Sequence, residues 1–192
     1  ETKTYNSPKR ILLIEPPNNL VVGFNATVVV EPLGLQYLAG NLLDIAEVKI
    51  FDMRVDPTPL GAEIESFKPD LVGIKEGYTV DVASVKGLAK DIKTLSPDIT
   101  VVVGGHHVSL APKDAFTPNI DVIVIGDGER IFRDLIVNMQ NGKGVSTTPG
   151  TIFQTLDGEF NQSNVGPMTK TSLKEFDSKA MNERPLPASP FG

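Results

Sequence analysis

The sequence predicts a doubly wound, Rossmann-like α/β sheet with helices on both faces, and two observations carry that prediction. Five short runs rich in branched aliphatic residues recur along the chain. Their apolar residues continue without alternation, which indicates strands buried on both faces. Segments with helical spacing lie between these runs, and strands that alternate with helices pair in parallel through right-handed crossovers.

Each expected element can be placed by its residues. The strands are RILLIE (10–15), VKIF (48–51), LVGIK (71–75), TVVVGG (100–105) and DVIVIG (121–126). Apolar residues at helical spacing predict helices around 35–42, 60–67, 85–92 and 131–139. Pro32 suits the first turn of the first helix, and Asn141 with Gly142 marks the end of the last one. Residues 111–116 leave room for only a turn or two.

A five-stranded sheet of this class most often has the flavodoxin-like strand order 2-1-3-4-5. In such sheets ligands bind outside the carboxyl ends of the strands. The residues that follow each strand are therefore the candidates for a functional site.

The pattern changes near residue 147. Asp157-Gly158 is a strong turn signal between two strand-like pieces, so we expect a small hairpin there. The polar segment after it ends rich in proline and is typical of a linker. We therefore expect an α/β domain over 1–147, and a hairpin extension and linker over 148–192.

Composition excludes several classes of protein. The net charge is −6, and no basic cluster suits nucleic acid. The chain has no cysteine, and so no disulfide, thiolate nucleophile or iron–sulfur ligand of its own. No apolar run approaches a membrane span, and the start lacks a signal region, so a cytoplasmic location is expected. The first residue, Glu1, suggests a processed or excised piece.

The loops after strands one and three leave two interpretations open. Residues 16–31 are long for a strand-to-helix connection, which suggests either a binding loop or an insertion without a role. After strand three, Lys75, Glu76, Gly77, Tyr78 and Thr79 either contact a ligand or form a solvated ion pair beside a packing aromatic residue.

Two glycine pairs follow strands four and five. Gly104 and Gly105 remove side chains where a ligand would need close approach to the backbone. The adjacent His106 and His107 are poorly suited to one metal, because consecutive side chains diverge and no further ligand completes a set.

The second pair, Gly126 and Gly128, again clears space, while Asp127 and Glu129 supply acceptors at a helix start. Position 131, where a dinucleotide fingerprint would need its third glycine, is Ile131. Flavin mononucleotide, phospho-receiver, Walker and Gly-x-Ser-x-Gly patterns also fail. The remaining features outline a broad pocket for a large ligand.

Four segments in order carry a family resemblance. They are EPLGLQYLAGNL (31–42), DLVGI (70–74), VVVGGHHVSLAPKD (101–114) and IDVIVIGDGE (120–129), followed by PGTIFQTLDGEF. Together they resemble the cobalamin-binding domain at the front of cobalamin-dependent radical SAM proteins, and the likeness covers essentially the whole chain. The family implies a corrin ring over the carboxyl ends of the strands and a nucleotide tail that passes the glycines of strands four and five.

The resemblance implies cofactor-binding roles for residues after three strands. Tyr78 and Thr79 would meet the ring or the upper tail, and His107 would match the family's usual histidine. The implied set is Lys75, Glu76, Gly77, Tyr78, Thr79, Gly104, Gly105, His106, His107, Gly126, Asp127, Gly128 and Glu129.

Two departures from classical cobalamin domains bear on how the cofactor is held. Where classical cobalamin domains have Asp-x-His-x-x-Gly, this chain has Glu15-Pro16-Pro17-Asn18-Asn19-Leu20. The resemblance therefore implies a base-off form without a histidine ligand to cobalt. Lys75 replaces a small hydroxyl residue found in many relatives. It either crowds the ring, bonds a corrin amide, or marks a copy that has lost the cofactor.

Radical chemistry needs three cysteines for an iron–sulfur cluster, which this chain lacks. We therefore expect a binding module of a larger enzyme, with no catalytic residue of its own. The cluster, S-adenosylmethionine and the radical SAM domain would lie in the missing part of that enzyme, which transfers methyl groups or closes rings. The competing hypothesis is a cofactor-free flavodoxin-like regulatory or interaction domain. A nucleotide-binding oxidoreductase is disfavoured by the failed phosphate fingerprints.

Overall fold

A computed structural model describes residues 3–17 and 29–163 of the chain. Its strands are β1 (Arg10–Glu15), β2 (Glu47–Asp52), β3 (Leu71–Lys75), β4 (Thr100–Gly104), β5 (Val122–Val124), β6 (Thr151–Gln154) and β7 (Phe160–Gln162). Its α-helices are α1 (Leu33–Gly40), α2 (Leu60–Phe67), α3 (Val82–Leu95), α4 (His106–Leu110) and α5 (Gly128–Gln140). Short 3-10 helices are η2 (Thr79–Asp81), η3 (Pro112–Ala115) and η4 (Val145–Thr147). Most of the long loop after β1 and the segment from residue 164 onward, where a linker is expected, lie outside the described residues.

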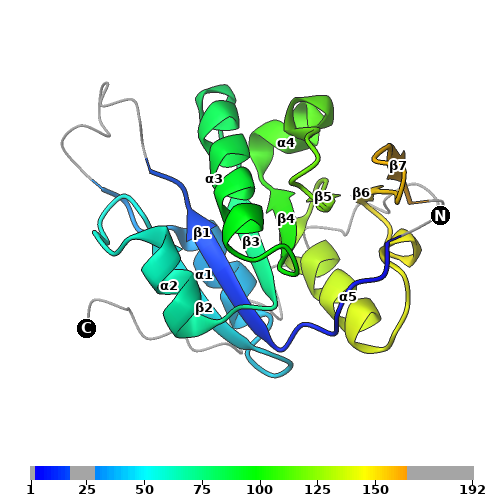
Figure 1. Cartoon of the computed structure of the whole chain (residues 1–192), viewed down its shortest axis with the longest axis horizontal. Coiled ribbons are helices and arrows are strands. Elements are labelled where there is room, and N and C mark those ends of the chain that lie inside the picture. Colours follow the sequence, from blue (N-terminus) through cyan, green and yellow to red (C-terminus); the bar gives the residue numbers. More distant parts are fainter. Residues whose placement is uncertain (1–2, 18–28, 164–192) are drawn as a thin grey trace, which may run out of the picture.

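One continuous sheet of seven strands forms the centre of the molecule, in the order β2-β1-β3-β4-β5-β6-β7 (Figure 1). The first five strands pair in parallel, which confirms the predicted order 2-1-3-4-5. The expected hairpin forms β6 and β7, and β6 pairs antiparallel with β5. The hairpin therefore continues the sheet as its antiparallel edge.

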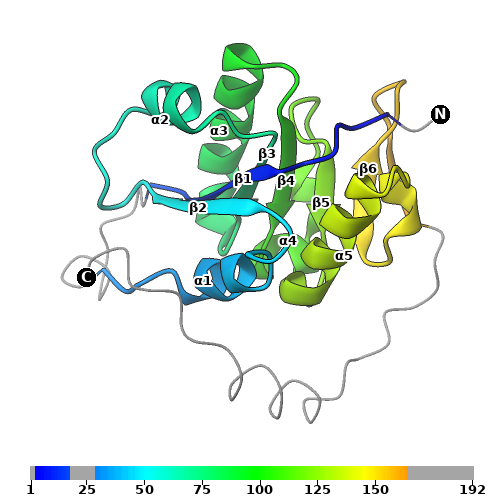
Figure 2. The same ribbon diagram turned by 90° about the horizontal axis from the view of Figure 1, so that it is seen from below.

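Helices cover both faces of this sheet, as the sequence predicts. Figure 2 shows α2 and α3 on one side of the strands and α1 and α5 on the other. Alternate residues of each buried strand pack in two hydrophobic cores, one on each face of the sheet. In β1, Leu12 and Ile14 pack toward α2 and α3, and Ile11 and Leu13 pack toward α1 and α5. Burial on both faces explains why the strand sequences are apolar without alternation.

Two local features differ from the sequence prediction. The helix expected over 35–42 ends at Gly40, although Leu42 is still fully buried in the same core. The helix α4 was not predicted, because its five residues are too few to show helical periodicity. Within α4, Val108 is buried and packs in the core on the side of α3.

The amino edge of the sheet is closed by polar contacts around Asp121. This carboxylate is 2% exposed; it accepts a hydrogen bond from the Val101 amide at 2.8 Å and lies 2.6 Å from Lys93 Nζ. An open space lies at the opposite, carboxyl edge of the sheet.

None of the helices in the described part of the chain has the length and apolar character that crossing a bilayer requires.

Candidate ligand-binding site

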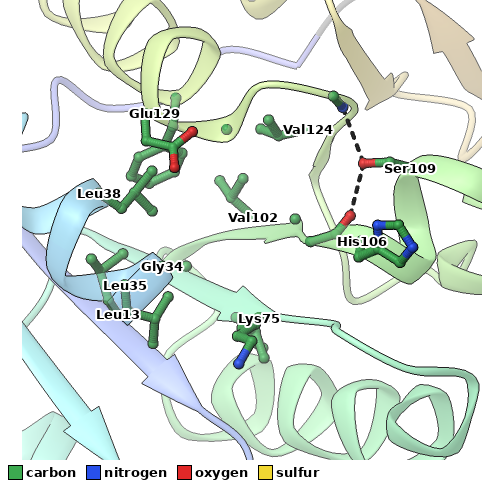
Figure 3. A pocket seen from close by; sticks show the side chains of 17 residues that line it. Leu13, Gly34, Leu35, Leu38, Lys75, Val102, His106, Ser109, Val124 and Glu129 are labelled. Atoms are coloured by element: carbon green, nitrogen blue, oxygen red, sulfur yellow. Dashed lines mark hydrogen bonds between the residues drawn. The ribbon is translucent and has the colours of Figure 1, made fainter. Parts of the chain in front are cut away.

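A cleft of about 420 Å³ lies between the sheet and helices α1 and α5, toward the carboxyl ends of β3, β4 and β5 (Figure 3). This volume is typical of small-molecule sites. Its seventeen lining residues are the glycines 34, 73, 104, 105, 126 and 128, the apolar Leu13, Leu35, Leu38, Ile74, Val102, Val124 and Phe132, and the polar Lys75, His106, Ser109 and Glu129.

The inner part of the cleft follows from the strand register. Leu13 in β1 pairs with Gly73 in β3, which pairs with Val102 in β4, so the three residues form one row across the sheet. A methyl group on Gly73 would lie 2.9 Å from Leu13 Cδ2 and 3.5 Å from Phe132 Cζ. The glycine therefore lets these two side chains lie close to the backbone of β3.

The outer part of the cleft is opened by the next row. Lys75 pairs with Gly104, and Gly104 pairs with Val124. A methyl group on Gly104 would lie 3.6 Å from Val124 Cβ, an ordinary contact. Gly104 is therefore not needed for packing within the protein, and its missing side chain leaves open space at the tip of β4.

Gly105 has a different role from its neighbour. Its φ is +135°, and a Cβ there would lie 2.4 Å from the backbone oxygen of Glu76. The Glu76 amide also donates to the Gly104 carbonyl at 2.7 Å. This approach between the ends of β3 and β4 requires a residue without a side chain.

Ser109 in α4 joins the loops that follow β4 and β5. Its hydroxyl donates to the Gly105 carbonyl at 2.7 Å and accepts the Gly126 amide at 3.0 Å, as the dashed lines in Figure 3 show. The sequence prediction missed Ser109, because α4 itself was not predicted.

Two charged side chains lie at the rim of the cleft. Lys75 Nζ donates to both carboxylate oxygens of Glu15, at 2.8 and 2.9 Å, so the lysine is paired with the last residue of β1. Glu129 belongs to the first turn of α5, and Figure 3 shows its side chain at the cleft. Burial raises the pKa of Glu129, and a side-chain hydrogen bond with Asp127 raises it further.

Seven of the thirteen residues singled out by the resemblance line the cleft, and six do not. The seven are Lys75, Gly104, Gly105, His106, Gly126, Gly128 and Glu129. The six that lie outside the lining are Glu76, Gly77, Tyr78, Thr79, His107 and Asp127.

His107 is engaged by other side chains. Its Nδ1 lies 3.2 Å from Thr79 Oγ1 and its Nε2 lies 3.0 Å from Asp114 Oδ2. The buried Glu76 carboxylate is 4.0 Å from Nε2. Within residues 3–17 and 29–163, no cluster of three or more His, Cys, Asp or Glu side chains is placed to hold a metal ion.

Sequence reasoning missed the cleft residues that come from α1 and from strand interiors. Leu35 and Leu38 carry the helical periodicity of α1, but their spacing does not show that the space beside them is open. The same holds for Gly73 and Phe132, whose proximity depends on tertiary packing.

Known proteins resemble this chain in sequence and in fold. An uncharacterized methyltransferase of Pyrococcus horikoshii, PH0819, is 27% identical over 95% of this chain and 41% of its own length. The hopanoid C-3 methylase of Methylococcus capsulatus is 28% identical over 67% of this chain and 26% of its own. The chain thus spans less than half the length of these relatives.

A solved structure shares the fold. The radical S-adenosylmethionine methyltransferase TsrM from Kitasatospora setae, with cobalamin and a [4Fe-4S] cluster bound, superposes with a TM-score of 0.65. It is 23% identical, and the match covers 84% of this chain and 30% of TsrM. The family model of the B12 binding domain matches residues 19–136, more than half of the sequence. The chain therefore belongs to the B12-binding domain family.

Proposed function

We propose that this chain holds cobalamin with the corrin ring over the ends of β3, β4 and β5 and the nucleotide tail in the cleft. The observation that carries the proposal is the cleft itself, which opens at the carboxyl edge of the sheet and is lined largely by glycines and apolar side chains. The lining residues fit such a cofactor, because a ring with a tail needs a broad edge without protruding side chains and a narrow apolar space below it.

The residues around the cleft would hold the cofactor in distinct ways. Gly104, Gly126 and Gly128 would let the tail approach the backbone, and Ser109 fixes the two loops between which it would pass. Lys75 would stand at the rim with its charge compensated by Glu15. Tyr78 is 66% exposed on the loop before η2, where it remains a proposed contact of the ring.

We infer that cobalamin binds base-off and without a histidine ligand from this chain. The segment from Glu15 to Glu31 contains no histidine, and the chain's two histidines lie together in α4. Of these, His107 is engaged by Thr79 and Asp114. A lower base that occupies the cleft is also unavailable to the cobalt.

We further infer that the chain acts as the cobalamin module of a radical SAM enzyme. Bound cobalamin would supply a cobalt centre that can carry a methyl group, and the protein would position it. The domain carrying the iron–sulfur cluster and S-adenosylmethionine would belong to the same parent protein. Methyl transfer to an unactivated substrate is the activity we propose, and ring closure is a related one. The boundary near residue 147 and the linker toward that domain are part of this proposal.

Equilibrium dialysis of the chain against hydroxocobalamin, followed by its visible spectrum, tests the proposal. We expect equimolar retention with a base-off spectrum. Gly104→Leu should abolish retention, and the matched control Gly87→Leu, at an open position of α3, should not. Failure of the unmodified chain to retain the corrinoid at high micromolar concentration would contradict the proposal and favour a cofactor-free regulatory domain.

A further inference from the structure

The cleft is polar at its rim and apolar at its inner end. Its four polar side chains belong to Lys75, which ends β3, to His106 and Ser109 in α4, and to Glu129 in the first turn of α5. Three of them already have partners, since Lys75 binds Glu15, Ser109 joins the two loops, and Glu129 has a side-chain hydrogen bond with Asp127.

The inner end lies two residues further back along the strands, a distance of roughly 6–7 Å. It is formed by the row of Leu13, Gly73 and Val102 and by Phe132, one turn into α5 from Glu129. Leu13, Val102 and Phe132 are at most 3% exposed. Figure 3 shows Leu13, Leu35 and Val102 around this part of the cleft.

The backbone of the described residues at the inner end of the cleft offers no free hydrogen-bonding groups to a ligand. Strand β3 lies between β1 and β4, so the donors and acceptors of Gly73 are directed along the sheet toward its neighbours. A ring placed against this row therefore meets carbon atoms and no polar side chain among the residues that line the cleft.

We propose that this inner end selects corrinoids whose lower base is an apolar benzimidazole over those whose lower base is a purine. The inference rests on the proposed cobalamin function and adds the class of corrinoid to it. A benzimidazole detached from the cobalt has a single free ring nitrogen, whereas a purine carries further ring nitrogens and, in adenine, an amino group. These additional polar groups would lose their hydrogen bonds to water in the cleft. Apolar pockets discriminate against added polar groups by about 10- to 100-fold, which is the preference we expect here.

Gly73 sets the size of this inner end. A methyl group at this position would force the Leu13 side chain, 2.9 Å away, to move, and it would also contact Phe132. Gly73→Ala should therefore weaken the binding of a corrinoid that places a base there. It should leave unchanged the binding of a corrinoid that has no base.

The test compares three probes on the unmodified 192-residue chain by equilibrium dialysis: hydroxocobalamin, its adenine-base analogue, and cobinamide, which lacks the nucleotide. We expect hydroxocobalamin to bind about 10- to 100-fold more tightly than the adenine analogue. Gly73→Ala should weaken the binding of hydroxocobalamin at least several-fold and should leave the binding of cobinamide unchanged. The control Gly87→Ala, at a position of α3 with no atom within 4 Å, should change neither.

The outcomes separate this inference from the proposed function. Equal affinity for the two bases, or an adenine analogue that binds more tightly, would overturn the selectivity and leave cobalamin binding intact. Cobinamide binding as tightly as hydroxocobalamin would show that the base contributes nothing and would also overturn it. If none of the three probes binds, the proposed function itself fails and the selectivity fails with it. The ligand comparison needs no variant, so it stands even if Gly73→Ala does not fold.

Discussion

Lys75 Nζ lies 2.8 and 2.9 Å from the two carboxylate oxygens of Glu15, and this ion pair joins the ends of β1 and β3 at the rim of the cleft. The Glu15 side chain is 9% exposed and that of Lys75 is 33% exposed. The charge of Lys75 at the rim of the cleft is therefore compensated by the last residue of the adjacent strand.

Removal of the Glu15 charge should destabilise the protein through Lys75. Glu15→Gln leaves the ammonium group without its carboxylate, and we expect the free energy of unfolding to fall by about 1–3 kcal/mol. Urea denaturation measures this as a lower midpoint with an unchanged slope. In a Lys75→Met background the same substitution should cost much less, because the partner is gone. Equal costs in both backgrounds would show that the pair contributes no coupling.

The two glycines at the end of β4 should respond differently to alanine. Gly105→Ala places a Cβ 2.4 Å from a backbone oxygen at a φ of +135°, so we expect a loss of at least about 2 kcal/mol of unfolding free energy. Gly104→Ala makes only an ordinary contact and should fold normally, yet it should reduce cobalamin retention because its methyl group enters the cleft. Urea denaturation and dialysis give the two readouts.

Of these two glycines, only Gly104 is suited to a substitution that tests ligand binding. A bulky residue at position 105 would abolish binding by disrupting the protein, which says nothing about the cleft. Comparable stability of Gly105→Ala and the wild type would contradict the close approach to Glu76.

Ser109→Ala should break the link between the loops that follow β4 and β5 at the rim of the cleft. The substitution removes one bond to the Gly105 carbonyl and one from the Gly126 amide, and we expect a loss of about 1–2 kcal/mol and a faster release of bound corrinoid. A matched control is Thr94→Ala in α3, where the hydroxyl donates to the carbonyl of Lys90, four residues earlier in the same helix. Identical effects of the two variants on stability and on release would contradict the bridging role of Ser109.

The buried Glu76 should make stability depend on pH. The residue is 0% exposed, and neither carboxylate oxygen has a hydrogen-bond partner within the described residues. Burial raises the pKa of Glu76 above its ordinary value of 4.5. The folded state therefore holds the proton more tightly than the unfolded state. Stability from this group is fully present below pH 4.5 and is lost as pH rises through the higher folded pKa.

Glu76→Gln should flatten this decline, because glutamine does not titrate. Thermal unfolding from pH 4 to pH 8 checks it, with Glu65→Gln, at an exposed position of α2, as the control for removing one negative charge. Parallel pH profiles for the two variants would contradict the assignment. The Glu129 carboxyl adds a similar dependence for the same reason, so the wild-type profile should not be attributed to Glu76 alone.

The strand tips of the site were predictable from sequence, and its inner surface was not. Gly104, Gly126 and Gly128 could be found because each follows an apolar run that ends at the carboxyl edge of a parallel sheet. Gly73 lies inside a strand, and its role depends on the register that aligns it with Leu13 and Val102. That register is set by pairing across three strands and leaves no local signal.

The direction in which a side chain points after the end of a strand could not be predicted from the sequence either. Glu76 directly follows Lys75, and both were expected at the ligand, but the lysine reaches the cleft and the glutamate is buried beside His107. Likewise, His106 lines the cleft while His107 bonds Thr79 and Asp114. The helix α4 that orients these two histidines is too short to be seen as a periodic pattern.

The electron density of the chain crystallised with hydroxocobalamin would show where the lower base of the cofactor lies. We predict that the lower base lies inside the cleft against Gly73, Val102 and Phe132, detached from the cobalt, with the corrin ring over the ends of β3, β4 and β5. A lower base bound to the cobalt, with the cleft between the sheet and α5 left unfilled, would contradict it.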